Sequence, residues 1–213
     1  MSEELDYHLE ARNQRHFANA FRGDEDVLIP EVLVDSTHVI VTEWIDGTPL
    51  ASVITNGTTQ ERDEAATLYL EFLLRAPNRA RMLHADPHPG NFRITDDGRL
   101  AVFDFGAVNR LPHGLPASLG RALTEALAGD AVALEAVLRE EGFIRKGIAI
   151  DPDALLEYLK PLVEPLLHDQ FTPTREWLRG AAATLQDPRR PQFLIGLKLN
   201  LPPEYLLIHR VWL

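Results

Sequence analysis

Two polar motifs flank a predicted β-hairpin near the middle of the chain, and they restrict the fold more than any other feature. The first is His84-Ala85-Asp86-Pro87-His88-Pro89-Gly90-Asn91, and the second is Asp104-Phe105-Gly106. Short apolar runs between them surround Asp96-Asp97-Gly98, a composition typical of a tight turn. Because a hairpin brings its two ends together, we expect the two motifs to lie side by side.

The spacing of these motifs fits phosphoryl transfer from ATP. That reaction needs metal ligands near the phosphates and a carboxylate that positions or deprotonates the acceptor. An H-x-D sequence, an asparagine five residues after the aspartate, and D-F-G after a hairpin form the catalytic and metal loops of protein kinases. We therefore predict that Asp86 and His84 are catalytic residues and that Asn91 and Asp104 bind Mg²⁺.

A second interpretation of the same loop is a metal site formed by His84, Asp86 and His88. Their i, i+2, i+4 spacing would place them on one face of a strand. Pro87 and Pro89 oppose this site, because two prolines within three positions prevent a regular central strand. We favour the kinase-like interpretation, in which His88 supports the turn or contacts phosphate. Two unrelated surface turns are the remaining alternative.

Hydrophobic periodicity predicts an α+β chain whose N-terminal strands give way to helices. Helices are predicted at residues 4–21, 60–74, 116–128, 130–141, 151–167, 174–186, 191–200 and 203–213, and strands at 27–29, 32–34, 38–42, 92–94 and 100–103. Residues 46–49 break the chain between the early strands and the long helix. The last helix ends on apolar residues without a cap, so we expect the chain to stop inside an element.

These motifs resemble the UbiB family of kinase-like proteins, also called the ADCK type. The resemblance runs nearly end to end and rests on residues 84–91, residues 104–106, Glu4-Leu5-Asp6-Tyr7, Glu10-Ala11 and Asn13. It implies a protein-kinase-like fold with a partial small lobe at residues 1–47 and a mainly α-helical large lobe at residues 48–213. We therefore expect ATP and Mg²⁺ as cofactors.

The resemblance also implies roles for three acidic residues near the N-terminus. Glu4 and Asp6 would belong to the segment that occupies the peptide-binding region of ordinary kinases, and Glu10 would pair with a strand lysine that contacts ATP phosphates. Helical spacing alone would only place these residues on a solvated face, where acidic charge favours a helix start. We count all three among the predicted cofactor-binding residues.

Thr42-Glu43-Trp44-Ile45 follows the last early strand and precedes the break at Gly47. Its position between the predicted lobes resembles the kinase hinge, whose backbone groups pair with adenine. We therefore predict nucleotide contacts from Thr42, Glu43 and Ile45. The alternative is a simple strand end, because recognition by backbone groups leaves little trace in side chains.

Composition restricts the partners and the compartment. The chain of 213 residues has a formal net charge of -11, so we expect no binding to nucleic acid, which requires a basic face. The absence of cysteine excludes disulfides and zinc-thiolate sites. No run approaches the roughly 18 apolar residues that span a bilayer. We expect a cytoplasmic protein, with peripheral contact to the inner face of a membrane as an open possibility.

The chain departs from the family pattern at its N-terminal side. Nothing before Glu4 supplies the phosphate-binding loop, the strand lysine or the lysine-glycine-glutamine motif of the family. We therefore expect this chain to be catalytically weak or inactive and its unpaired strands to favour self-association. No A-P-E sequence follows Gly106, so a protein substrate is not implied.

The sequence is compatible with two functions. The first is a kinase-like ATPase that supports isoprenoid quinone or lipid metabolism, with proteins of quinone biosynthesis as partners. The second is a non-catalytic scaffold that binds a partner protein or a membrane surface.

Overall fold

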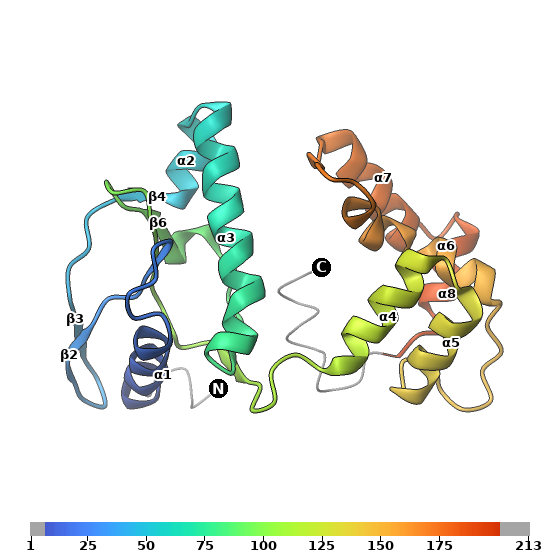
Figure 1. The fold of residues 1–213 in the computed structure, drawn as a ribbon, viewed down its shortest axis with the longest axis horizontal. Coiled ribbons are helices and arrows are strands. Elements are labelled where there is room, and N and C mark those ends of the chain that lie inside the picture. Colours follow the sequence, from blue (N-terminus) through green and yellow to red (C-terminus); the bar gives the residue numbers. More distant parts are fainter. Residues whose placement is uncertain (1–6, 201–213) are drawn as a thin grey trace. The chain divides into compact units, whose positions relative to one another are not determined.

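The computed structural model describes residues 7–200, which divide into two compact units. The first unit extends to Leu115, and the second begins at Pro116. All strands of the described residues belong to the first unit, whereas the second consists of helices and their connections (Figure 1). The predicted α+β class is confirmed.

The helices and strands have the following bounds. The first unit contains α1 (Tyr7–Ala20), β1 (Val27–Leu28), β2 (Val32–Asp35), β3 (Ile40–Thr42), β4 (Thr48–Pro49), α2 (Leu50–Asn56), α3 (Thr59–Arg79), β5 (Met82–His84), the 3₁₀ turn η2 (Pro89–Asn91), β6 (Phe92–Ile94), β7 (Leu100–Val102) and β8 (Val108–Arg110). The second contains α4 (Ala117–Ala128), α5 (Ala131–Glu140), α6 (Pro152–Val163), the 3₁₀ turn η3 (Glu164–Leu167), α7 (Arg175–Gln186) and α8 (Pro191–Gly196).

The predicted hairpin is confirmed as β6–β7, the centre of a four-stranded sheet of order β1-β7-β6-β4. Phe92 lies opposite Val102, and Ile94 lies opposite Leu100. Gly98 takes a φ of 87°, which the turn requires and which glycine adopts without strain. β1 runs parallel to β7, so the chain before the predicted hinge and the hairpin share one sheet.

The pairing of β5 with β8 was not predicted. These two strands are antiparallel, with His84 opposite Val108. Each has only three residues, and their partners are far apart in sequence, so no local pattern indicates them. The pairing brings the segment before the first motif next to the segment after the second.

Helix α3 begins near its predicted start and continues beyond its predicted end. Thr58 and Glu61 form a capping box, which fixes the first turn. The predicted end at residue 74 is wrong, because the helix extends to Arg79 with Pro77 inside its last turn. Its buried residues include Phe72 and Ala76, which contribute to the core.

One aromatic core joins α1, α3 and the hairpin. The side chains of Phe17, Phe72, Phe92 and Phe105 are all 0% exposed. The ring centroids of Phe17 and Phe105 are 5.0 Å apart. Since α1 and the second motif fill the same core, burial of these rings also fixes the path of Asp104-Phe105-Gly106, which we call the metal loop after its predicted role.

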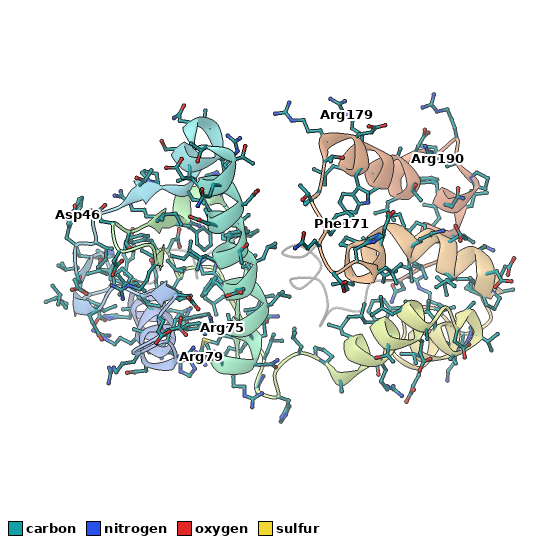
Figure 2. The ribbon with its side chains drawn as sticks, turned by 45° about the horizontal axis from the view of Figure 1, so that its top comes forward. Asp46, Arg75, Arg79, Phe171, Arg179 and Arg190 are labelled. Carbon is teal, nitrogen blue, oxygen red and sulfur yellow. The ribbon has the colours of Figure 1, made fainter. Side chains whose placement is uncertain are left out.

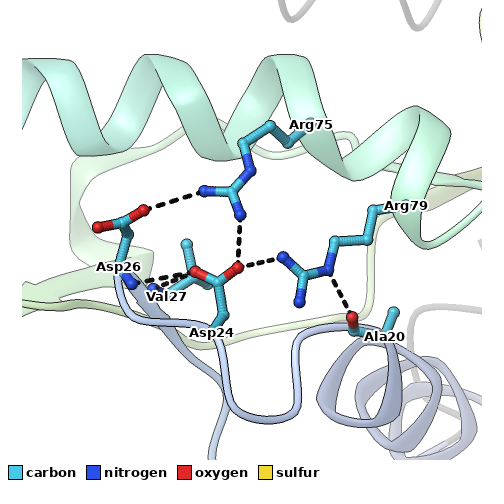
Figure 3. A network of polar contacts seen from close by, with 6 residues as sticks. All are labelled: Ala20, Asp24, Asp26, Val27, Arg75 and Arg79. Atoms are coloured by element: carbon cyan, nitrogen blue, oxygen red, sulfur yellow. Dashed lines mark hydrogen bonds and ion pairs between the residues drawn. The ribbon is translucent and has the colours of Figure 1, made fainter.

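Asp24 links the end of α1 to α3, as Figure 3 shows. Its carboxylate is 3% exposed and accepts hydrogen bonds from the backbone N–H groups of Asp26 and Val27. It also forms ion pairs with Arg75 and Arg79. Burial raises the pKa of Asp24, but these donors outweigh it and hold the pKa below its usual value.

The second unit has its own apolar core, which includes Leu134, Ile144, Leu155 and Ile195. The helices predicted in this region are confirmed, but two of them end earlier than predicted. The predicted helix at 151–167 changes at residue 164 into η3, which begins with Glu164-Pro165, and the predicted helix at 191–200 ends at residue 196. The predicted helix at 203–213 lies outside the described residues.

Figure 2 shows Phe171, Arg179 and Arg190 in the second unit. The ring of Phe171 packs edge-on against Trp177 with a centroid separation of 5.0 Å, and the indole N–H of Trp177 donates to Glu164. These contacts attach α7 to η3.

The predicted lobe boundary at residues 47 and 48 stays a prediction. In the described residues, β1 from the first predicted lobe pairs with β7 from the second. The boundary between the two compact units follows Leu115 instead. None of the helices between residues 7 and 200 combines the length and apolarity that crossing a membrane requires.

Candidate nucleotide and metal site

His84 lies inside the aromatic core at the end of β5. It is 0% exposed, and its ring centroid lies 5.4 Å from that of Phe105 and 5.6 Å from that of Phe92. Its Nε2 lies 2.7 Å from the backbone carbonyl of Asp104, an acceptor, so Nε2 carries the proton. Burial lowers the pKa of His84, which keeps the ring neutral. The ring therefore supports the backbone of Asp104 from within the core, and the predicted catalytic role of His84 stays a prediction.

Asp104 has an unusual backbone conformation. Its φ of 59° lies in the left-handed region, which non-glycine residues rarely adopt. Its carbonyl accepts from His84, and its Oδ1 accepts the backbone N–H of Gly106 at 3.1 Å. These two bonds, with the burial of Phe105, stabilise a conformation that would otherwise be unfavourable. Such strain is found mainly at functional sites.

Asp86 and Asn91 contact each other across the first motif. The Nδ2 of Asn91 donates to Oδ2 of Asp86 at 2.9 Å. The turn η2 brings them together, with the N–H of Asn91 bonded to the carbonyl of His88. The N–H of Phe103, next to Asp104, donates to the carbonyl of Asn91 at 2.8 Å. The hairpin thus joins the two motifs through their backbone, as predicted from their positions in the sequence.

Tyr69 is a residue of this site that sequence reasoning missed. Its hydroxyl donates to the carbonyl of Pro87 at 2.7 Å, and its ring packs edge-on against Phe92. Burial, with the charge of Asp86, raises the pKa of Tyr69 to about 12, so the hydroxyl keeps its proton. Tyr69 lies within the helix predicted at residues 60–74, and nothing in its spacing indicates the bond to the loop.

Helix α1 contacts the metal loop through two side chains. Asn13 is 4% exposed, and its Nδ2 donates to the carbonyl of Phe105 at 3.0 Å. Glu10 lies near Asp104: a side chain at Gly106 would come within 3.3 Å of Oδ1 of Asp104 and 3.8 Å of Oε2 of Glu10. Burial and, after it, the charge of Asp104 raise the pKa of Glu10. The carboxylates of Glu10 and Asp104 therefore both lie next to Gly106.

The alternative metal triad does not form. His84 points into the core, whereas His88 is exposed and its Nδ1 accepts the N–H of Gly90 at 3.0 Å. Between residues 7 and 200, no three His, Asp or Glu side chains are placed to share a metal ion. Oxygen atoms of Asn91 and Asp104 are the donor type that Mg²⁺ prefers.

The predicted hinge residues lie at the end of β3 and directly after it. Thr42 ends the strand, and the N–H of Glu43 donates to the carbonyl of Glu31 at 2.8 Å. Ile45 is half-buried, whereas Trp44 between them is 78% exposed. Glu4 and Asp6 lie outside the described residues, so their predicted roles stay predictions.

Comparison with solved structures identifies the fold. The chain superposes with a TM-score of 0.87 on Rv3197 from Mycobacterium tuberculosis, described as a complex with erythromycin. The two are 36% identical, and the match covers 98% of this chain and 52% of that one.

Comparison with curated proteins gives plant relatives. ACTIVITY OF BC1 COMPLEX KINASE 3 of Arabidopsis thaliana, a chloroplastic protein, is 31% identical over 98% of this chain and 28% of its own length. The chloroplastic ACTIVITY OF BC1 COMPLEX KINASE 1 of the same plant is 34% identical over 70% of this chain and 22% of its own length. The chain thus spans about a quarter of the length of these relatives.

A family model gives the assignment. The model of the ABC1 atypical kinase-like domain matches residues 1–138, which include α1, the hairpin and both motifs. The predicted kinase-like fold and the predicted family, which these relatives represent, are confirmed. The chain belongs to the ABC1 atypical kinase-like family.

Proposed function

We propose that this chain binds a nucleoside triphosphate together with Mg²⁺, as the nucleotide-binding part of an atypical kinase or ATPase. The observation that supports this most directly is the left-handed backbone of Asp104, which bonds to His84 and is linked by the Phe103–Asn91 backbone bond to the Asp86–Asn91 pair. A strained aspartate at this junction has little value for folding alone. It has a clear use in holding a metal ion and positioning a phosphate acceptor.

Each residue has a distinct role in this proposal. Asn91 donates its Nδ2 to Asp86, which leaves its Oδ1 as the metal-ligating atom. Asp104 supplies the charged ligand, and Asp86 orients the acceptor hydroxyl or water. His84 is a positioning residue, since it hydrogen-bonds the backbone carbonyl of Asp104 and its ring packs against Phe105. Mg²⁺, when bound, supplies the counter-charge for the phosphates.

The metabolic role and the cellular location of the chain are also proposals. Named relatives are chloroplast kinases whose names refer to the BC1 complex, and the similar mycobacterial chain was solved with erythromycin. The family resemblance of the motifs is the support for a role near isoprenoid quinone or lipid metabolism, with a cytoplasmic location and peripheral membrane contact. A scaffold without catalysis is the second candidate, and the proximity of Glu10 to Asp104 favours it, because like charges oppose phosphate binding.

Magnesium-dependent nucleotide binding can be tested with one variant and one control. Asp104→Asn should abolish the increase in melting temperature that Mg²⁺ and ATP together produce, because it removes the charged metal ligand. His88→Ala should retain it, since His88 is exposed and bonds only the nearby N–H of Gly90. Differential scanning fluorimetry with and without EDTA makes the comparison. The same shift in wild type and Asp104→Asn would contradict the proposal.

A further inference from the structure

A cavity of about 150 Å³ lies in the first unit where helix α1 ends. Its apolar lining includes Ala18, Phe21, Val27 and Ile29, which are all buried. A cavity of about this volume with apolar walls is large enough for a benzene ring. Of the predicted site residues that the structure describes, only Glu43 borders it, so the cavity is separate from the proposed metal ligands.

Several charged side chains also line the cavity, and three of them already have partners elsewhere. Arg22 donates to Oδ1 of Asn19 at 2.8 Å. Arg99 pairs with Asp97 at 2.7 Å. The carboxylate of Asp24 is turned toward the arginines of α3, as Figure 3 shows. The charges of these three side chains are therefore largely balanced by residues that do not line the cavity.

Two glutamates at the edge of the cavity lack a strong partner. Glu31 lies 3.7 Å from Arg22, beyond hydrogen-bonding distance, and both side chains are more than half exposed. Glu43 forms no ion pair with any residue between 7 and 200. The backbone N–H of Glu43 donates to the carbonyl of Glu31 at 2.8 Å, so the two residues border the cavity side by side. The unbalanced charge at the cavity is therefore negative.

We propose that this cavity binds a small organic cation, an apolar body the size of one ring that carries a primary ammonium group. The body packs against the apolar lining. The ammonium group has three donors and no acceptor, which suits two neighbouring carboxylates. An anion would meet only arginines that already have partners, and a neutral molecule would gain no charge interaction with the glutamates. This inference does not depend on the proposed nucleotide site.

The test compares three ligands by isothermal titration calorimetry on the 213-residue chain at neutral pH and constant ionic strength. Benzylamine has the ring and the charge, benzyl alcohol has the ring alone, and ammonium chloride has the charge alone. Benzylamine should bind about fivefold more tightly than benzyl alcohol, the value of two exposed charge contacts. Ammonium, which has no apolar body to bury, should bind more weakly than either.

Two double variants locate the binding site. Glu31→Gln combined with Glu43→Gln should weaken benzylamine binding by about fivefold and leave the binding of benzyl alcohol unchanged. Glu25→Gln combined with Glu71→Gln is the matched control, because it changes the net charge equally at two exposed glutamates that do not line the cavity. The control should leave the binding of both ligands unchanged.

Each outcome either supports or overturns the inference. Loss of benzylamine affinity only in the variant changed at Glu31 and Glu43 supports it. An equal loss in both double variants would indicate general attraction of cations to an acidic chain and overturns it. Benzylamine binding that is absent from the wild-type chain, or no tighter than that of benzyl alcohol, also overturns it. The comparison of ligands on the wild-type chain decides even if a variant lowers the melting temperature, and no nucleotide is present, so the result is independent of the proposed function.

Discussion

Asp24 shows how much one carboxylate contributes to the arrangement of the site. It has four donors, two from the backbone of its own loop and two from arginines on α3. Arg79 also donates its Nε to the carbonyl of Ala20 at 2.6 Å, which attaches the last turn of α1 to the same point. Because α1 carries Glu10 and Asn13, the ion pairs of Asp24 help to fix the helix that contacts the metal loop (Figure 3).

Replacing Asp24 with asparagine should therefore lower the free energy of unfolding by about 2 kcal/mol, since the variant leaves Arg79 without its charged partner and Arg75 with Asp26 alone. Urea denaturation measures the change. Asp26→Asn is the matched control: Asp26 pairs with Arg75 but is 47% exposed, so its loss should cost much less. Equal costs for the two variants would contradict the role given to Asp24.

The difference in stability between wild type and Asp24→Asn should also depend on pH, in a direction that the pKa of Asp24 fixes. The pKa of Asp24 is lowered in the folded chain, so its contribution to stability is complete above the unfolded value of about 3.9 and is lost as the pH falls toward the folded value. The difference between wild type and Asp24→Asn should therefore shrink below about pH 4. A difference that stays constant from pH 6 to pH 3 would show that charge is not the cause.

At the scale of elements, α1 and β5 approach the metal loop from two directions. Asn13 on α1 donates to the carbonyl of Phe105, and His84 on β5 donates to the carbonyl of Asp104. Consecutive carbonyls of the D-F-G segment are thus bonded to different elements. A shift of either element would change the direction in which the carboxylate of Asp104 points.

Asn13→Leu should lower stability by about 1–3 kcal/mol, because it leaves the buried carbonyl of Phe105 without its donor. It should also weaken Mg²⁺–ATP binding. Gln14→Leu is a close control, since Gln14 is equally buried and donates to the carbonyl of Pro30, away from the metal loop. Calorimetry and urea denaturation on both variants distinguish the two roles. An equal loss of ATP affinity in both would assign Asn13 a structural role only.

Sequence reasoning identified the elements that carry local patterns and missed those that depend on distant partners. The turn at residues 96–98 predicted the hairpin, and the helical spacing of apolar residues predicted most helices. Strands β5 and β8 were missed because their pairing joins three-residue segments far apart in sequence. The proximity of Glu10 to Asp104 was missed for the same reason, since it depends on the packing of α1 against the loop.

At the scale of the whole molecule, the two-stranded sheet formed by β2 and β3 stands out for its exposed apolar face. Leu33 is 63% exposed, Val34 61%, Val39 54% and Val41 44%. In the part of the chain that the structure describes, this sheet has no third strand. Exposed apolar strands of this kind are a common cause of association between chains.

The 213-residue chain should therefore self-associate, and Leu33→Lys combined with Val41→Lys should reduce the association. Multi-angle light scattering at matched concentrations gives the mass of each sample. Val132→Lys is the control, because Val132 is 70% exposed on α5, a helix of the second unit that is not part of the sheet, and should leave the mass unchanged. A stable monomer from the unmodified chain would show that the exposed strands are not adhesive.

The burial of His84 and Phe105 has a consequence for how such motifs persist during evolution. Both side chains fill the core, so selection for folding retains them even in a descendant that has lost its chemistry. The carboxylates of Asp86 and Asp104 contribute no comparable packing, so the proposed activity constrains them more than folding does. Among descendants of this chain, aspartates retained at positions 86 and 104 would therefore mark lineages that still use the site, whereas the histidine and the phenylalanine would mark only those that still fold.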